Sequence, residues 1–379
     1  MDYRYLGRSA LKVSSLCLGA MMFGGEADEA TSARIIDKAF EQGVNFIDTA
    51  DAYHGGRSEQ VVGRAIAPQR DSWVVATKFG YPTHPATMQH RPNEQGQSRK
   101  WIMQTVENSL RNLGTDYIDV LYFHRALADA PLEEAMRTIG DLIRQGKIRY
   151  YGVSNFRGWR IAEVVRIADQ LGIERPVVSE PLYNIVDRTA EVEQLPAAAN
   201  YGLGVVPYSP LARGVLSGKY AVDAAPAADS RAGRGDKRLQ QTEWRPESLK
   251  IAQTIARHAA ERGTTSIAFA LAWVLKNQLI SSAIAGPRTE AQWDSYLDAL
   301  TLELGSEDEK LVDSLVVPGH ASTPGYTDPG YPIEGRRVVY TLYGGRGTCP
   351  MFCRYQDQAP SHMGLRDCRI CDSRESTQV

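Results

Sequence analysis

A repeated order of strand and helix patterns constrains the fold of this chain of 379 residues more than any other feature. Short apolar or β-branched runs of strand length recur, and each is followed by a segment with the apolar spacing of an amphipathic helix. Eight such units follow one another between Ser15 and Ala299. Apolar strands that alternate with helices indicate a parallel sheet whose outer face is covered. Eight units without an internal change of pattern favour a closed α/β barrel, the (β/α)8 or TIM barrel, over an open sheet.

The eight units place strands and helices at definite positions. The predicted strands are Ser15–Leu18, Asn45–Ile47, Trp73–Thr77, Val120–Phe123, Tyr150–Val153, Pro176–Ser179, Gly204–Tyr208 and Ser282–Ala285. The predicted helices are Glu29–Gln42, Glu59–Ala67, Trp101–Leu113, Leu132–Gln145, Trp159–Leu171, Ala190–Asn200, Glu247–Arg262, Ile267–Lys276 and Glu290–Ala299. A long insertion precedes the helix that begins at Glu247, so the seventh unit is the largest.

Further segments lie on either side of the eight units. Tyr3–Val13, with a turn at Gly7-Arg8-Ser9, predicts a hairpin that closes one end of the barrel. Glu303–Val316 predicts a C-terminal helix outside the repeat. We therefore expect a barrel domain over residues 1–318 and an extended surface arm over 319–337, which is rich in Pro, Gly and Thr. A disordered tail containing Cys and Arg is expected over 338–379.

Composition excludes several classes of partner. The formal net charge of −2 provides no basic excess for nucleic acid or an anionic membrane surface. No apolar run approaches the roughly 18–20 residues of a membrane span. The N-terminal segment has no signal-peptide pattern, which predicts a cytoplasmic protein. Cys17 stands alone in an apolar run and predicts a buried, inert thiol, while the other four cysteines all follow residue 348. No cysteine pair can therefore cross-link the barrel, as expected in a reducing compartment.

Polar residues follow several predicted strands directly. In a (β/α)8 barrel the carboxyl ends of the strands form the mouth of the active site, so these side chains are expected on one rim. A tyrosine, Tyr53, lies in the loop just beyond the first of them. The convergence of a carboxylate, an ammonium and an imidazole predicts a catalytic site. The residues at the strand ends are Asp48, Lys78, His124, Asn155 and Glu180.

The segments that contain these residues resemble the aldo-keto reductase superfamily. FIDTADAY (46–53), VATKFG (75–80) and LYFHR (121–125) are similar to the segments that carry its catalytic tetrad. GVSNF (152–156), YSPLARGVLSGKY (208–220) and AGPRTEAQ (285–292) are similar to its cofactor segments. The resemblance extends from about Tyr3 to about Val317 and keeps the family's order. It implies a cytoplasmic NADPH-dependent oxidoreductase that reduces a small-molecule carbonyl substrate, an aldehyde or ketone, to the alcohol.

The resemblance assigns the catalytic roles to Asp48, Tyr53, Lys78 and His124. Tyr53 is the implied proton donor, and its phenol has an ordinary pKa near 10. The ammonium of Lys78 should favour the phenolate and lower that pKa. Asp48 should hold Lys78 in place and balance its charge, while His124 donates a hydrogen bond to the carbonyl oxygen.

The cofactor residues are also implied by the resemblance, because the chain has no G-x-G-x-x-G after an early strand and so no Rossmann nucleotide site. NADPH would lie extended across the barrel mouth. Its carboxamide would meet Ser154, Asn155 and Glu180, and its nicotinamide ring would stack on Tyr208. The remaining contacts are implied at the pyrophosphate, by Ser209, Leu211, Gly214 and Lys219, and at the adenosine phosphate, by Gly286, Arg288 and Gln292.

Two residues depart from the family's pattern. Glu180 stands where the family usually has a glutamine, and an ionised carboxylate can accept from the carboxamide but cannot donate to it. Tyr296 stands where the family often has an asparagine near the adenine, and it can either stack on the adenine or face away. Preference for NADPH over NADH is nevertheless expected, because Arg288 at a helix N-terminus suits a 2′-phosphate.

The substrate-side residues are open to more than one interpretation. The loop Gly80–Ser98, which contains His84 and His90, is the predicted wall of the substrate site. Arg125 and Arg213 could contact an anionic or hydroxylated substrate, or they could be solvated or cofactor-side charges. The sequence fixes neither the carbonyl compound nor the oligomeric state.

Two other functions are compatible with the sequence. The same superfamily includes regulatory β subunits of potassium channels, which bind a nucleotide, and GVLSGKY (214–220) is similar to that branch too. Alternatively, the spacing of the tail cysteines could supply four thiolates to zinc. The tail has no strand or knuckle pattern, so we predict no metal site there. The four cysteines are Cys349, Cys353, Cys368 and Cys371.

Overall fold

The computed structural model of the chain describes residues 1–83, 93–127 and 130–333. These residues belong to a compact unit, Met1–Tyr326, and to the start of a second unit, Thr327–Val379. The tail 338–379 lies outside the described residues, as do His84 and His90. Within the described segments, no helix has both the length and the apolar character needed to cross a membrane.

Eight parallel strands form the centre of the first unit, in the order β10-β3-β4-β5-β6-β7-β8-β9. The two outer strands of this order are also joined, because the N–H of Ser281 donates to the carbonyl of Val205 at 2.8 Å and that of Ile284 to Pro207 at 3.0 Å. The sheet therefore closes, and the predicted (β/α)8 barrel is confirmed. The strands are β3 (Leu16–Gly19), β4 (Phe46–Asp48), β5 (Val74–Phe79), β6 (Ile118–Phe123), β7 (Ile148–Ser154), β8 (Val178–Glu180), β9 (Gly204–Val205) and β10 (Ala283–Ala285).

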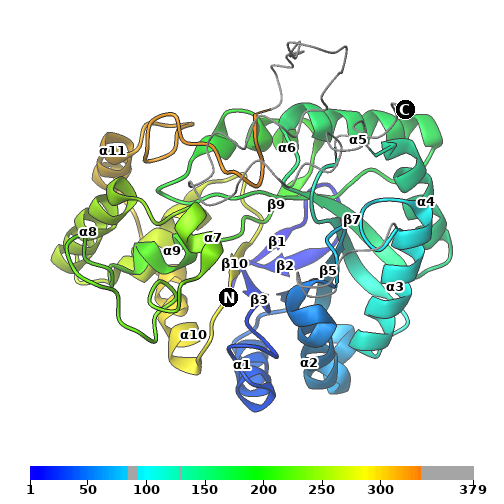
Figure 1. Cartoon of the computed structure of the whole chain (residues 1–379), viewed down its shortest axis with the longest axis horizontal. Helices are drawn as coiled ribbons and strands as arrows, with labels where there is room; N and C mark the ends of the chain where they lie inside the picture. The colour runs from blue at the N-terminus through cyan, green and yellow to red at the C-terminus, as the bar shows by residue number, and fades with distance from the viewer. Residues whose placement is uncertain (84–92, 128–129, 334–379) are drawn as a thin grey trace, which may run out of the picture. The chain divides into compact units, whose positions relative to one another are not determined.

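The helices are arranged around these strands, as Figure 1 shows. Most begin where the sequence predicts, and several have a side-chain cap, such as Ser98, which accepts from the N–H of Trp101. The helices are α1 (Glu29–Glu41), α2 (Arg57–Ile66), α3 (Arg99–Leu113), α4 (Leu132–Arg144), α5 (Gly158–Leu171), α6 (Gln194–Tyr201), α7 (Lys237–Gln241), α8 (Pro246–Glu261), α9 (Ser266–Lys276), α10 (Glu290–Leu297) and α11 (Ser306–Leu315).

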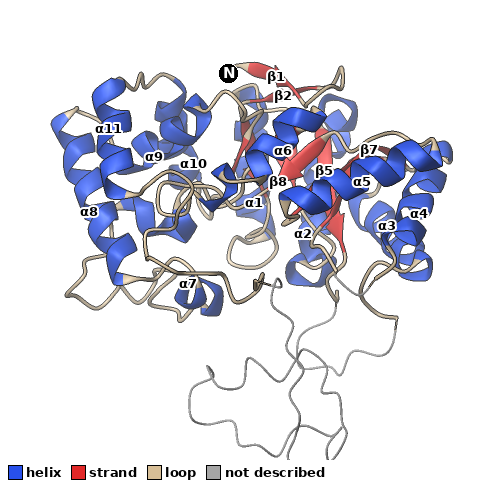
Figure 2. Cartoon of the chain, turned by 90° about the horizontal axis from the view of Figure 1, so that it is seen from above, coloured by secondary structure: helices blue, strands red, loops and turns tan. Residues whose placement is uncertain are grey.

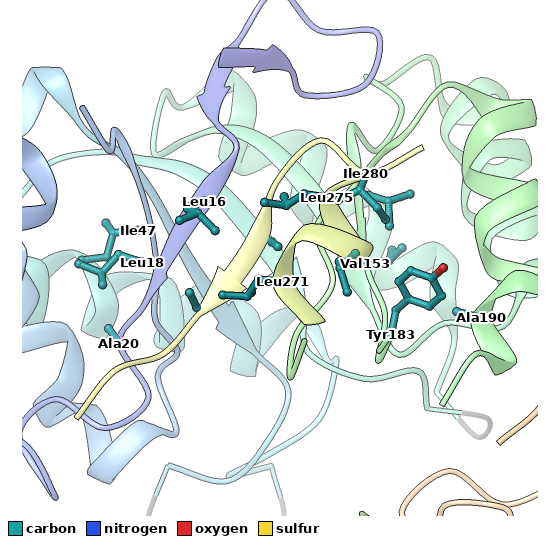
Figure 3. Close-up of a cluster of buried hydrophobic side chains, with 14 of the residues drawn as sticks. Leu16, Leu18, Ala20, Ile47, Val153, Tyr183, Ala190, Leu271, Leu275 and Ile280 are labelled. Atoms are coloured by element: carbon teal, nitrogen blue, oxygen red, sulfur yellow. The ribbon is translucent and has the colours of Figure 1, made fainter. Parts of the chain in front are cut away.

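Side chains on the strands alternate between two apolar layers, because successive residues of a strand point to opposite faces. One layer fills the inside of the barrel and contains Cys17, Phe46, Val120 and Val178, all buried. The other lies between the strands and the surrounding helices, where Leu16 and Leu18 of β3 belong to the same cluster as Leu271 and Leu275 of α9 (Figure 3). A residue's position along its strand therefore decides whether it faces the barrel interior.

The N-terminal hairpin, β1 (Tyr3–Tyr5) and β2 (Lys12–Ser14), closes one end of the barrel as predicted. In Figure 2 it lies above the strands, and α7 lies on the opposite side. Leu6 and Val13 of the hairpin region are fully buried in the interior layer. Gly7 has φ +61°, and a Cβ built there would lie 2.5 Å from the amide nitrogen of Gly204. This close approach requires glycine.

The C-terminal part of the compact unit follows α11, the helix predicted outside the repeat. Beyond residue 318 the chain is hydrogen-bonded to the segment after β8: the N–H of Arg188 donates to His320, and that of Ser322 donates to Val186, both at 2.9 Å. The guanidinium of Arg245 lies 3.8 Å from the ring centre of Tyr326. The expected boundary at 318 therefore falls inside a segment that is bonded to the barrel as far as Tyr326.

Candidate active site

Polar side chains replace apolar ones on the interior face where the strands end. Asp48, Lys78 and Glu180 lie two residues beyond Phe46, Ala76 and Val178, all of which belong to the interior layer. Because side chains repeat every two residues along a strand, the three charged groups face the same space inside the carboxyl end of the barrel. All three are buried, with exposed fractions of 3%, 0% and 3% respectively. The strand-end residues predicted to converge do so.

Lys78 is the centre of this group. Its ammonium donates hydrogen bonds to Asp48 Oδ1, to the carbonyl oxygen of Thr49 at 3.1 Å and to the hydroxyl of Tyr53 at 3.4 Å. The carboxylate of Glu180 also approaches, with Oε1 3.5 Å from Nζ. The pKa of Lys78 is raised well above its usual value, because the attraction of Asp48 and Glu180 exceeds the effect of burial. Lys78 is therefore a buried cation that is fixed between two carboxyl groups and a phenol.

Tyr53 begins a short 3₁₀ turn, Tyr53–Gly56, in the loop that follows β4. The next residue, His54, has φ +49°, a conformation that costs energy for a residue with a side chain and is concentrated at functional sites. Burial raises the pKa of Tyr53, and the charges of Asp48 and Glu180 add to the rise, while Lys78 lowers it. Lys78 thus acts in the expected direction, but its effect is smaller than that of burial, and the pKa of the phenol is raised overall.

His124 follows β6 and lies beside Tyr53, with ring centres 5.8 Å apart and the rings nearly perpendicular. Burial, together with the charges of Lys78 and Arg125, lowers the pKa of His124 well below its usual value. The imidazole is therefore neutral at neutral pH and can donate one hydrogen bond. Its Nδ1 is buried and has no hydrogen-bond partner among the described residues.

The residues implied at the nicotinamide end form one hydrogen-bonded chain. Ser154 ends β7 and donates to the carbonyl of Glu180 at 2.9 Å. Asn155 follows with φ +60° and donates to Ser154 at 3.0 Å and to the carbonyl of His124 at 3.0 Å. The hydroxyl of Tyr208 donates to Asn155 Oδ1 at 2.8 Å. This chain connects Tyr208 and Asn155, through Ser154, to the backbone of Glu180.

The residues implied at the pyrophosphate lie in the segment after β9, which has unusual backbone angles. Ser209 has φ +54° and its carbonyl accepts from Asn184 at 3.0 Å, while Gly214 has φ +95°. Leu211 precedes the 3₁₀ turn Ala212–Ser217. Lys219 lies next to Gly214, since a Cβ built at Gly214 would be 3.5 Å from Nζ.

Gly286, Arg288 and Gln292 lie after β10, at the beginning of α10. Gln292 Oε1 accepts from the backbone N–H of Arg288 at 2.8 Å, and the helix is capped by Thr289. The guanidinium of Arg288 donates to the carbonyl of Asp229 at 3.2 Å, and the residue is half-buried. Tyr296 of the same helix is 6% exposed and packs against Trp293, so it faces the core and does not present its ring for stacking.

The two arginines whose roles the sequence leaves undecided, Arg125 and Arg213, have different contacts in the structure. Arg213 pairs with Glu243 at 3.0 Å and is held by that carboxylate. The guanidinium of Arg125 lies 4.4 Å from the ring centre of Tyr81, which itself packs edge-on against His124. Arg125 is therefore linked to His124 through the ring of Tyr81, and Arg213 has a carboxylate partner.

Sequence reasoning missed two features of this site. Tyr122 is fully buried under Lys78, 5.9 Å from its ammonium, and its hydroxyl has no hydrogen-bond partner in the described part of the chain. The contact between Glu180 and Lys78 was also not foreseen. The two-residue alternation that places His124 on the interior face also places Tyr122 there, so this signal was present in the sequence. No cluster of His, Cys, Asp or Glu that could hold a metal occurs among the described residues.

Comparisons with known proteins agree with this geometry. A sequence model of the Aldo/keto reductase family matches residues 15–317. The chain is 35% identical to "Uncharacterized oxidoreductase YrpG" of Bacillus subtilis (strain 168), over 86% of this chain and 98% of that protein. It is 36% identical to "Probable voltage-gated potassium channel subunit beta" of Arabidopsis thaliana, over 79% of this chain and 91% of that protein. It is 30% identical to "L-glyceraldehyde 3-phosphate reductase" of Escherichia coli O157:H7, over 83% of this chain and 93% of that protein.

Proposed function

The chain belongs to the aldo/keto reductase family, and from this premise we propose that it is an NADPH-dependent reductase of aldehydes or ketones. The observation that carries the proposal is the buried ammonium of Lys78, which is bonded to Asp48 and to the hydroxyl of Tyr53 beside a neutral His124. This arrangement suits a reaction in which a carbonyl oxygen gains negative charge and then a proton.

Each residue of the proposed site has a separate role in the reaction. Bound NADPH supplies the hydride that goes to the carbonyl carbon. His124 donates a hydrogen bond to the carbonyl oxygen, and Tyr53 donates its proton to the same oxygen, so that an alcohol and a tyrosinate result. Lys78 stabilises the tyrosinate as it forms, and a proton from solvent restores the phenol. Burial raises the pKa of Tyr53 and so keeps its proton in place at neutral pH, as reduction requires.

The residues present fit NADPH. Glu180 has a buried carboxyl oxygen, Oε2, that lacks a hydrogen-bond partner among the described residues. Such an atom can meet the carboxamide of a nicotinamide. The backbone carbonyl of the same residue accepts from Ser154, which begins the Ser154–Asn155–Tyr208 chain. Arg288, at the N-terminus of α10, offers a cation and a helix dipole to the 2′-phosphate. The segment from Ser209 to Lys219 would hold the pyrophosphate.

The change Tyr53→Phe tests the assignment of the acid. Because it removes the proton donor and little else, we expect NADPH binding to be retained and carbonyl reduction to fall by a factor of about 10²–10⁴. Binding is measured by fluorescence titration, and turnover by NADPH absorbance with a panel of aldehydes. Tyr117→Phe is the control, since that hydroxyl binds Asp71 near the surface. A Tyr53→Phe variant with more than about a tenth of the wild-type kcat would assign the proton to another group.

The relatives named as channel subunits support a second candidate, a nucleotide-binding regulatory subunit with little turnover. It requires the cofactor site but not rapid proton transfer. The aldehyde panel separates the two candidates: NADPH oxidation that depends on both the aldehyde and Tyr53 supports the reductase. Tight NADPH binding with no turnover of any aldehyde supports the regulatory subunit.

A further inference from the structure

The surroundings of Glu180 do not satisfy an ionised carboxylate. The side chain is 3% exposed, and Oε2 lacks a hydrogen-bond partner within the described residues. The nearest cation, Lys78, is an ammonium with three N–H donors. These three hydrogen bonds go to Asp48, to the carbonyl of Thr49 and to Tyr53. Glu180 Oε1 lies farther away, at 3.5 Å from Nζ, and is held by the charge of Lys78 and by a long, weak hydrogen bond from it.

The charges around Glu180 do not balance if both carboxyl groups are ionised. Lys78 contributes one positive charge, and Asp48 and Glu180 together would contribute two negative charges, in a place where each of the two acids is only 3% exposed. An unbalanced buried charge is unfavourable, and a group usually takes up or releases a proton to avoid it. The titratable groups around it are neutral in their usual forms and cannot supply the missing positive charge. They are Cys17 of β3, Tyr53 after β4, and Tyr122 and His124 at β6.

The geometry decides which carboxyl group takes the proton. Asp48 accepts a direct hydrogen bond from Lys78, which favours its ionised form. Glu180 Oε1 lies farther from the same ammonium, at 3.5 Å, so the hydrogen bond that it receives from Lys78 is weak. Burial raises the pKa of Asp48 too, but the charge of Lys78 and its direct hydrogen bond oppose that rise. Burial and the negative charge of Asp48 raise the pKa of Glu180 well above its usual value.

We propose that Glu180 is a positioning residue that carries a proton at neutral pH, so that Lys78 stays committed to Asp48 and Tyr53. A protonated carboxyl group has one donor and one acceptor, like the side-chain amide of glutamine. Oε2 can then donate to the cofactor's carboxamide as well as accept from it. The part that concerns the carboxamide rests on the proposed function, whereas the proton on Glu180 does not.

The protonation state has a consequence for pH dependence. When the pH rises through the pKa of Glu180, a second carboxylate appears 3.5 Å from Lys78 and opposes the formation of tyrosinate at Tyr53. The pKa of Glu180 is higher in the folded protein than in the unfolded chain, where it is about 4.3. Protonation of Glu180 therefore stabilises the fold fully at a pH below the unfolded pKa, and this stabilisation is lost as the pH rises toward the folded pKa. Glu180→Gln keeps a neutral group at every pH and removes this dependence.

Infrared spectroscopy of the cofactor-free protein tests the proton directly. The difference between wild type and Glu180→Gln at neutral pH should contain the carbonyl stretch of a protonated carboxylic acid. The control is Glu29→Gln, because Arg64 lowers the pKa of that exposed carboxyl, and its difference spectrum should contain only carboxylate bands. A Glu180→Gln difference spectrum with only carboxylate bands would overturn the proposal. The infrared test of the proton on Glu180 does not depend on NADPH binding. If the chain bound no NADPH, the proposed function would be wrong, but the proposed proton would not be contradicted.

NADPH affinity provides the second readout. At neutral pH, Glu180→Gln should bind NADPH within about twofold of wild type, and Glu180→Leu should bind it about three to ten times more weakly, as expected for one lost hydrogen bond. At higher pH the Kd of wild type should rise while that of Glu180→Gln stays constant. An affinity for Glu180→Gln as weak as that for Glu180→Leu would show that the amide does not replace the acid, against the proposal.

Discussion

Arg288 is the residue from which cofactor preference can be predicted. Its guanidinium lies at the N-terminus of α10 and is bonded within the described residues to a single backbone carbonyl, that of Asp229. Arg288→Ala should therefore raise the KM for NADPH far more than that for NADH, because NADH lacks the 2′-phosphate. A charge-assisted hydrogen bond contributes about 1.5–3 kcal/mol, which corresponds to a factor of roughly 10–150.

A neighbouring arginine provides the control for this change. Arg34 pairs with Glu290 in the first turn of the same helix, at 2.7 Å, and is exposed. Arg34→Ala should leave the ratio of the two KM values unchanged. If Arg288→Ala weakens NADPH and NADH equally, the 2′-phosphate is bound elsewhere or the enzyme does not prefer NADPH.

At the scale of single residues, the sequence predicted which chemical groups lie close together in the site. It did not predict how the charges of these groups shift one another's pKa values. Asp48, Lys78 and His124 could be placed because each directly follows an apolar strand, and the structure brings them together with Tyr53. The contact between Lys78 and Glu180 depends on the curvature of the barrel, which brings together residues of strands that are not neighbours in the sheet. The net rise in the pKa of Tyr53 likewise depends on how deeply the side chain is buried, and this cannot be read from the sequence alone.

The N-terminal hairpin provides a prediction at the scale of elements. A Cβ at Gly7 would lie 2.5–2.6 Å from backbone atoms of Val177, Gly202 and Gly204. Gly7→Ala should therefore force the hairpin away from the barrel and lower the free energy of unfolding by about 2 kcal/mol or more, the sum of backbone strain and lost packing. Urea unfolding measures this change.

Gly114 after α3 is a matched control for the hairpin. It has a similar φ of +63°, but a Cβ built there meets no atom within 4 Å. Gly114→Ala should cost only the strain of a left-handed backbone, roughly 1 kcal/mol. Equal losses in the two variants would mean that the hairpin is not held against the barrel by this contact.

Most boundaries of the elements were predicted to within two or three residues, and the exceptions have local causes. The predicted helix Ala190–Asn200 is instead a 3₁₀ turn, Thr189–Glu191, followed by α6 from Gln194. Pro196 lacks an N–H and belongs in the first turn of a helix, which explains the later start. The predicted strand Gly204–Tyr208 is shortened to two residues, because Pro207 cannot donate to a neighbouring strand.

At the scale of the whole molecule, the residues proposed for catalysis and cofactor binding all lie within one compact unit. The proposed site is built from the ends of β4, β5, β7 and β8 and from the loops after β4, β6, β7, β9 and β10. Its geometry therefore depends on closure of the complete barrel and not on any single unit. The family match ends at residue 317 and the compact unit at Tyr326. Every residue named for the proposed reaction precedes both of these positions.

The last prediction concerns residues 338–379, which show no apolar period that could pack against the barrel. A chain that ends at Arg336 should melt within a few degrees of the full chain, since a shift of about 2–4 °C corresponds to roughly 1 kcal/mol in a large domain. It should also reduce the same aldehydes at a similar rate. Zinc should change neither melting temperature. Stoichiometric zinc that survives dialysis of the full chain, together with a lower melting temperature after chelation, would contradict this prediction. The site would then be formed by the thiolates of Cys349, Cys353, Cys368 and Cys371.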